Sequence, residues 1–141
     1  MAAMHHRRHA GDEGRTIRVV AADDHAASLR ATTETLTRAG LDVVGVSNSG
    51  QGAIDDVRTY SPDVALVDLR MPGLSGTDVA RTVCARYPRT RVVILSAYAD
   101  EEIVQLALEA GATAYVTKDS APEEIVRAVY RAADAQPTPP R

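Results

Sequence analysis

The sequence is poor in cysteine and in aromatic residues. Its 141 residues include one cysteine, Cys84, no tryptophan and no phenylalanine, and aromatic residues make up 4% of the total. A single cysteine permits no internal disulfide, which excludes a disulfide framework and is typical of a reducing compartment, so we expect the cytoplasm. Because aromatic residues are so few, the core must be built mostly from valine, leucine, isoleucine and alanine.

Long hydrophobic runs and a basic surplus are also missing. No apolar stretch approaches the ~20 residues that a membrane-spanning helix needs, and residues 1–10 lack the apolar segment of a signal peptide. The formal net charge is −3, which argues against broad nucleic-acid binding by this chain alone. We therefore expect no membrane partner.

The two ends of the chain differ in composition from its middle. Residues 1–15 hold His5, His6 and His9 without apolar periodicity; we expect a disordered tail, with adventitious metal binding by the histidines as the weaker alternative. Residues 136–141 hold three of the seven prolines, so 135–141 are interpreted as a linker or a tail. The predicted domain covers residues 16–134.

Five short apolar runs alternate with five helical patterns in that domain. The runs predict strands over 17–22, 43–46, 64–67, 92–95 and 114–117, and helices over 25–39, 50–60, 76–87, 100–110 and 121–133. Ser75 with Asp78, and Ser120 with Glu123, have capping-box spacing at two helix starts. Apolar strands that alternate with helices predict an α/β fold with a parallel sheet covered on both faces. The size favours a doubly wound sheet over a barrel, which needs ~250 residues.

Asp68 is the residue around which the candidate site is organised. It follows the apolar run 64–67, and the Met71-Pro72-Gly73 turn after it cannot continue a strand. Asp68 should therefore lie at the carboxyl end of a buried strand, where open α/β sheets bind ligands. A carboxylate in that position needs a partner, because its desolvation is costly.

Polar residues end three other strands and should meet Asp68 at the same edge of the sheet. Asp23 and Asp24 follow the first strand, Ser96 the fourth and Lys118 the fifth. Considered one at a time, these residues have simple structural explanations: Asp24 could cap a helix, Ser96 could be a turn residue and Lys118 could be a solvated charge. Together they predict a site: three carboxylates favour Mg²⁺, with Mn²⁺ possible, and the ammonium and hydroxyl suit phosphoryl oxygens. Without a Gly-rich nucleotide loop, an aspartate can itself accept the phosphoryl group.

These residues resemble the signature of bacterial response-regulator receiver domains over roughly residues 16–134. The matching motifs are Asp23-Asp24, Asp68 with Met71-Pro72-Gly73 and Gly76, Ser96-Ala97, and Tyr115-Val-Thr-Lys118. The resemblance implies a flavodoxin-like, doubly wound, five-stranded parallel sheet of order 2-1-3-4-5 with five helices. It also implies that Asp68 accepts a phosphoryl group from a partner histidine kinase, and that the protein catalyses only its own phosphorylation and dephosphorylation.

The same resemblance implies roles for the residues around Asp68. Mg²⁺ would be held by Asp24, Asp68 and the backbone carbonyl of Arg70, with Asp23 acting through water. Ser96 and Lys118 would hold the phosphoryl oxygens, and Tyr115 would be the aromatic switch, with a ring that is partly exposed before phosphorylation. Arg70 and Tyr98 each lie two residues after a site residue, where a long side chain can screen the phosphoryl group from water and set its lifetime.

Finer features resemble the NarL/FixJ type of transcriptional regulator, whose output is a LuxR-type helix-turn-helix. They are Asp23-Asp24-His25, Asp68-Leu-Arg-Met-Pro-Gly, residues 107–112 and Lys118-Asp119. No such output pattern follows here, so any DNA contact would be made by a domain outside this chain. We favour a receiver belonging to a longer regulator; a stand-alone receiver acting in a phosphorelay or as an interaction module is the alternative. A haloacid-type phosphatase is disfavoured, because Arg70 stands where such sites place a second aspartate.

The last two helical patterns carry more apolar residues than one sheet can cover. In the last, Val126, Tyr130 and Ala133 form a stripe beside the pair Ile125 and Val129. The preceding pattern has a second stripe of Ile103, Leu106 and Ala110 beside Val104, Ala107 and Leu108. We expect a two-fold homodimer that buries Val126 and Tyr130 and is favoured by phosphorylation.

Overall fold

Five parallel strands form one sheet at the centre of the molecule. The structure is a computed structural model that describes residues 15–98 and 100–135, so the expected tail over 1–14 and the end of the chain over 136–141 lie outside the described residues. The strands are β1 (Arg18–Ala22), β2 (Asp42–Ser47), β3 (Val64–Asp68), β4 (Arg91–Ser96) and β5 (Ala114–Thr117). Their order, β2-β1-β3-β4-β5 with every pairing parallel, confirms the predicted topology.

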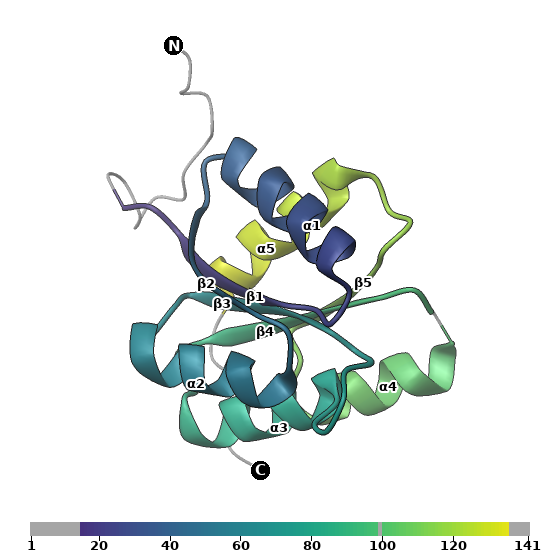
Figure 1. The fold of residues 1–141 in the computed structure, drawn as a ribbon. Helices are drawn as coiled ribbons and strands as arrows, with labels where there is room; N and C mark the ends of the chain where they lie inside the picture. The colour runs from purple at the N-terminus through teal and green to yellow at the C-terminus, as the bar shows by residue number, and fades with distance from the viewer. Residues whose placement is uncertain (1–14, 99, 136–141) are drawn as a thin grey trace.

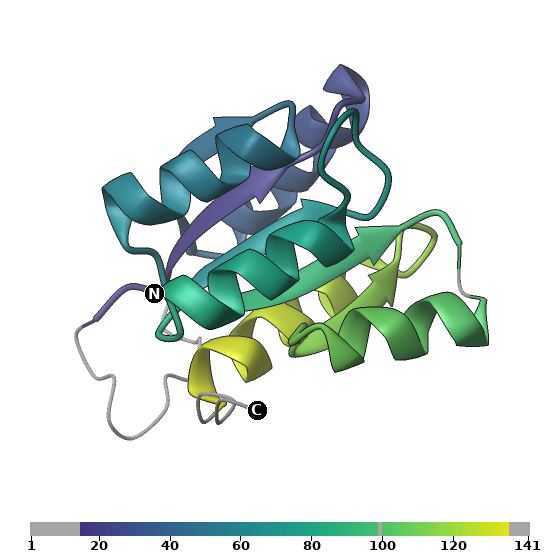
Figure 2. The same ribbon diagram turned by 90° about the horizontal axis from the view of Figure 1, so that it is seen from below.

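Helices cover both faces of the sheet (Figure 1). One face carries α1 (Ala26–Arg38) and α5 (Pro122–Asp134); the other carries α2 (Gly50–Tyr60), α3 (Gly76–Arg86) and α4 (Glu101–Glu109). The view from below in Figure 2 shows α2, α3 and α4 lying side by side across their face. Alternate residues of each strand enter two separate apolar cores, one under each helical layer. None of the helices in the described ranges has the length and apolar character that a bilayer crossing requires.

The helix ends follow local sequence signals in most cases. Gly40 and Gly111 have φ of 91° and 116° just after α1 and α4, a conformation that glycine adopts without steric cost. At α3, Ser75 and Asp78 form both hydrogen bonds of the predicted capping box. The predicted box at α5 is wrong: Ala121 is the N-cap, no side chain caps the helix, and the Ser120 hydroxyl instead lies 3.0 Å from that of Thr117.

The sheet covers more of α5 than the sequence pattern suggests. Ile125 and Val129 are buried as predicted. Val126 and Tyr130 are half-buried and pack against the edge of the same core. The Tyr130 hydroxyl also donates a hydrogen bond to the carbonyl of Ala39 at the end of α1, at 3.2 Å. The stripe is therefore partly covered by α1, and part of it stays accessible.

The predicted division of α4 into two stripes is wrong. Ala107 is fully buried, and Ile103 and Ala110 pack against the core, because positions i, i+4 and i+7 share one face of a helix. Leu106 and Leu108 are exposed, at 59% and 41% of their surface. The apolar surplus of α4 therefore consists of these two leucines, taken from both of the expected stripes.

Candidate functional site

Asp68 ends the central strand and is almost fully buried. All five residues of β3 are buried, Asp68 at 5% exposure, because β1 and β4 flank the strand and helices cover both its faces. After Asp68 the chain turns sharply, and the Gly76 amide donates to the Leu69 carbonyl at 2.8 Å. A Cβ on Gly76 would lie 2.6 Å from the Asp68 carbonyl oxygen. Glycine at this position therefore permits the close turn that points Asp68 out of the sheet edge.

Asp23 and Asp24 reach the same edge from the turn between β1 and α1. The Asp23 side chain is buried, and one of its oxygens accepts a hydrogen bond from the His25 amide at 2.9 Å. Asp24 is more exposed. His25, not Asp24, is the N-cap residue of α1, and no side chain makes a capping hydrogen bond there. The simple capping role for Asp24 is therefore excluded, and its carboxylate remains available to a ligand.

Lys118 links the two buried carboxylates. Its Nζ lies 2.8 Å from Asp23 Oδ2 and 3.5 Å from Asp68 Oδ1, and its backbone amide donates to the Ser96 carbonyl, which fixes the end of β5 beside β4. Burial acts to lower the pKa of Lys118, but hydrogen bonds and charges from Asp23 and Asp68 outweigh it and raise that pKa. The ammonium therefore stays charged and offers a fixed positive charge to an anion.

The surroundings of Asp68 disfavour its ionised form. Burial is the largest cause that raises the pKa of Asp68, and the negative charge of Asp23 adds to it; Lys118 acts in the opposite direction without cancelling them. An added cation would relieve the repulsion among the carboxylates.

Three contacts link a group of side chains beside the acidic site, made up of Ser96, Tyr98, Arg70 and Tyr115. Ser96 is fully buried, and its Oγ accepts a hydrogen bond from the Tyr98 amide at 3.1 Å. The Arg70 guanidinium carbon lies 4.7 Å from the centroid of the Tyr98 ring. The Tyr115 hydroxyl donates to the Tyr98 carbonyl at 2.8 Å, and the Tyr115 residue is partly exposed, as expected. Tyr98 therefore connects the other three residues.

The donor set fits a divalent cation. Ligand atoms of Asp23, Asp24, His25 and Asp68 all lie within 4.8 Å of one another. Beside them, Asp24, His25 and Arg70 line a groove of about 600 Å³ that extends along the β3–α3 turn, which leaves room for bound water. Carboxylate oxygens are the ligands that Mg²⁺ prefers. His25 directly follows Asp24, yet the pattern of polar residues at strand ends predicts no role for it.

The residues proposed for self-association lie away from this edge. Val126 and Tyr130 line a separate groove of about 510 Å³ between α5 and the last turn of α1, together with Thr35 and Ala39. The structure thus places the predicted interface residues and the acidic site on different parts of the molecule.

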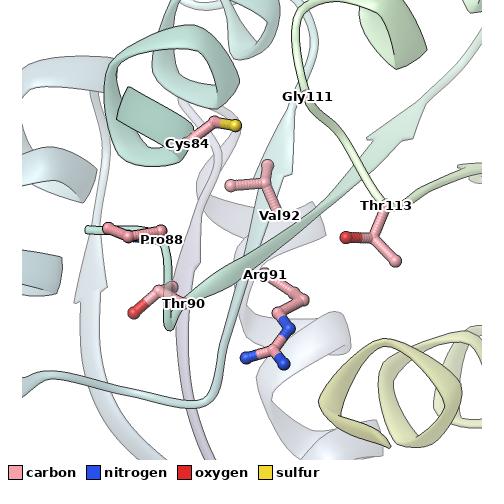
Figure 3. Close-up of a pocket in the computed structure, with 7 residues that line it drawn as sticks. All are labelled: Cys84, Pro88, Thr90, Arg91, Val92, Gly111 and Thr113. Atoms are coloured by element: carbon pink, nitrogen blue, oxygen red, sulfur yellow. The ribbon is translucent and has the colours of Figure 1, made fainter. Parts of the chain in front are cut away.

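A small cavity lies at the opposite end of the sheet, where β4 begins (Figure 3). Its volume of about 10 Å³ is roughly that of one water. Figure 3 shows the Cys84 thiol pointing toward the turn at Gly111, while the Arg91 side chain extends away from it. A Cβ on Gly111 would lie 2.9 Å from Cys84 Sγ. Cys84 therefore fills space beside a tight turn and takes no part in the acidic site.

Comparison with known proteins identifies the family. The family model described as the response regulator receiver domain matches residues 19–130. The chain belongs to this family. The matched range includes the positions from Asp23 to Lys118, and the fold described above is that of a receiver domain of a two-component response regulator.

Several relatives of this receiver domain are transcriptional regulators, and one is a protein-glutamate methylesterase of Myxococcus xanthus. A Mycobacterium tuberculosis protein named "Probable transcriptional regulatory protein NarL" is 40% identical over 114 residues, which cover 80% of this chain and 53% of the relative. The Bacillus subtilis transcriptional regulatory protein YhcZ is 35% identical over 112 residues, covering 79% of this chain and 52% of the relative. The receiver chain therefore spans about half the length of the curated relatives that it matches.

Solved structures agree with this relationship. The receiver domain of NarL from Mycobacterium tuberculosis superimposes with a TM-score of 0.83 at 38% identity, covering 86% of this chain and 98% of that one. A LuxR-family regulator from Aurantimonas gives a TM-score of 0.78 at 30% identity, covering 86% of this chain and 88% of that one. The receiver fold predicted from the strand-end motifs is thus confirmed.

Proposed function

We propose that this receiver domain is a phosphorylation switch in which Asp68 accepts a phosphoryl group from a sensor histidine kinase. The observation that carries the proposal is the position of Asp68: a buried carboxylate at the end of the central strand, with the Lys118 ammonium 3.5 Å away and two further carboxylates beside it. This arrangement supplies a nucleophile, a cation site and a fixed positive charge, which together suit phosphoryl transfer.

The residues divide the chemistry among them. A carboxylate oxygen of Asp68 attacks the phosphorus of the donor phosphohistidine, the P–N bond breaks, and its electron pair remains on the donor imidazole. Asp24, Asp68 and the Arg70 carbonyl would hold Mg²⁺ (or Mn²⁺), with Asp23 acting through water. The bound ion would neutralise charge on the phosphoryl oxygens. Lys118 and the Ser96 hydroxyl would bind the remaining oxygens, and hydrolysis of the acyl phosphate returns Asp68 to its starting state.

Phosphorylation is proposed to act through Ser96, Tyr98 and Tyr115. When Ser96 moves toward the phosphoryl group, the hydrogen bond from the Tyr98 amide to Ser96 Oγ, 3.1 Å long here, has to change. The Tyr98 carbonyl is the acceptor for the Tyr115 hydroxyl, so a shift of Tyr98 is passed on to the Tyr115 ring. Arg70 and Tyr98 are proposed to set the lifetime of the phosphoryl group by limiting the access of water.

The biological setting is proposed from the relatives and from the composition. Relatives of about twice the matched length are transcriptional regulators, so we propose a transcription output carried by a domain outside this chain, control by homodimerisation, and a cytoplasmic location. The protein is proposed to catalyse only its own phosphorylation and dephosphorylation. A phosphorelay or interaction module without an output of its own remains the second candidate, because the described receiver is a complete fold by itself.

Acetyl phosphate tests the proposed chemistry. With Mg²⁺, the parent should gain one acid-labile phosphoryl group, measured by intact mass, and Asp68→Asn should gain none. Asp24→Ala should weaken Mg²⁺ binding but preserve the far-ultraviolet circular dichroism spectrum, because it also removes a repelling carboxylate. Equal labelling of the parent and Asp68→Asn would move the acceptor elsewhere, and unchanged Mg²⁺ affinity in Asp24→Ala would remove Asp24 from the ligand set.

A further inference from the structure

His25 places a nitrogen donor among the carboxylates of the acidic site. Its Nδ1 lies 3.3 Å from Asp24 Oδ1 and 3.5 Å from Asp23 Oδ1. Its backbone amide donates to Asp23, which holds the start of α1 against the site. The imidazole does not cap the helix, is 71% exposed and borders the groove beside Asp24. Neither core packing nor a side-chain capping hydrogen bond accounts for the position of the imidazole.

We infer that His25 is an additional ligand of the cation and makes this receiver selective for Mn²⁺ over Mg²⁺. The inference rests on the proposed function, because it concerns the ion of that same site. Around an octahedral ion with bonds of ~2.1 Å, adjacent donors lie ~3.0 Å apart and opposite donors ~4.2 Å apart. His25 Nδ1 lies 3.3 Å from Asp24 Oδ1, close to the adjacent spacing. The four donors lie within 4.8 Å of one another, which is wider than the ~4.2 Å spacing of opposite donors, so they would draw closer when an ion binds, with Asp23 still acting through water.

The donor type determines which ion gains from His25. Mg²⁺ is a hard cation that binds oxygen and retains its water, whereas imidazole is a better ligand for transition metals. Mn²⁺ is the transition metal that also suits the carboxylate and carbonyl oxygens of the rest of this site. Lys118 already occupies Asp23 Oδ2 at 2.8 Å, so Asp23 has less to offer a metal than Asp24 or Asp68. The exposed His25 imidazole, which borders the groove beside Asp24, would supply an additional donor to the ion. Removing it should therefore reduce the affinity for Mn²⁺ and change the affinity for Mg²⁺ little.

Electron paramagnetic resonance tests whether the imidazole binds. The full chain is used with His5, His6 and His9 changed to alanine, so that the N-terminal histidines cannot bind Mn²⁺. Electron spin-echo modulation of bound Mn²⁺ should show coupling to one imidazole nitrogen in this background, and the coupling should be absent after His25→Gln. Titration should show a loss of about tenfold in Mn²⁺ affinity, while the Mg²⁺ affinity, measured by competition, changes less than twofold. Circular dichroism checks that α1 is intact.

Asp24→Asn separates the failure of this inference from the failure of the proposed function. If Mn²⁺ binds and is lost in Asp24→Asn, but shows no nitrogen coupling, His25 is only an ion-pair partner of the aspartates and the inference is overturned. Coupling that persists in His25→Gln overturns it as well. If neither Mn²⁺ nor Mg²⁺ binds in a manner that depends on Asp24 or Asp68, the proposed Mg²⁺-dependent switch itself is contradicted.

Discussion

The buried carboxylates of the acidic site lower the stability of the folded protein when they are ionised. Asp68 is buried beside Asp23, and both burial and that neighbouring charge raise its pKa. A carboxyl group whose pKa is raised by folding favours the folded state in its protonated form. The corresponding stability is present below the ordinary pKa of 3.8 and is lost as the pH rises through the folded-state pKa.

Asp68→Asn should therefore stabilise the metal-free protein at neutral pH. The amide has no charge to bury, so the free energy of unfolding at pH 7 should rise by about 1 kcal/mol. The gain in the free energy of unfolding should shrink as the pH falls through the raised pKa of Asp68, because the carboxyl group of the parent is then protonated. Mg²⁺ should also reduce the gain, because it binds the parent. Thermal unfolding at several pH values, with and without Mg²⁺, measures the difference. A gain that does not vary with pH would point to packing and not to charge.

The stacked pair Arg70 and Tyr98 should act as one unit on the lifetime of the phosphoryl group. Because the guanidinium lies 4.7 Å from the ring centroid, removing either side chain removes the same contact, which is worth ~0.5–1 kcal/mol at an exposed position. Arg70→Ala and Tyr98→Ala should each shorten the lifetime, and the double variant should lose less than the two single effects combined. Dephosphorylation rates after removal of acetyl phosphate give this comparison. Arg86→Ala, an exposed arginine near the end of α3, is the control and should leave the rate unchanged.

At the scale of elements, the turn from β3 to α3 determines how Asp68 is presented. Gly76→Ala should destabilise the fold by ~1–3 kcal/mol, because the new Cβ would lie 2.6 Å from the Asp68 carbonyl oxygen. It should also weaken Mg²⁺ binding by displacing the strand end. Gly73→Asn is the control. Gly73 has a positive φ, which asparagine tolerates, and no atom lies within 4 Å of a Cβ added there. Urea denaturation that ranks the two variants equally would show that the turn is not tightly packed.

The elements themselves could be predicted because strand and helix signals alternate cleanly. The apolar runs predict each strand end to within one residue, and the polar residues that follow the runs identify Asp68 and Lys118 as site residues. The errors concern contacts between elements. Ser120 and Glu123 match a capping box, yet Ser120 pairs with Thr117 across the turn. Leu106 lies at helical spacing from Ile103, yet the sheet accepts the face of Ala107. The hydrogen-bond partner of Ser120 and the buried face of α4 depend on the packing of neighbouring elements, which the spacing of apolar residues in the sequence does not reveal.

For the whole molecule, the groove between α1 and α5 is the proposed contact between two copies. Val126 and Tyr130 are half-buried there, whereas Arg30, Glu34 and Thr37 make the outer face of α1 polar. Val126→Glu should abolish the dimer expected with beryllofluoride and Mg²⁺, because it places a charge in the apolar part of the contact. Tyr130→Glu should have the same effect.

Analytical ultracentrifugation with and without beryllofluoride measures this assembly. Leu108→Glu is the matched control, since Leu108 is an exposed apolar residue on α4, on the other face of the sheet. It should dimerise like the parent. If Val126→Glu and Tyr130→Glu also dimerise normally while Leu108→Glu does not, the copies associate through α4.

Chemical mapping of the phosphorylated residue tests the central claim most directly. The full chain is incubated with acetyl phosphate and Mg²⁺, then reduced with borohydride, which converts an aspartyl phosphate into homoserine. Peptide mass spectrometry then locates the homoserine. The account predicts homoserine at position 68 and unmodified aspartate at positions 23 and 24. Homoserine at either of those positions, or an unmodified Asp68 in a protein that has gained a phosphoryl group, would contradict it.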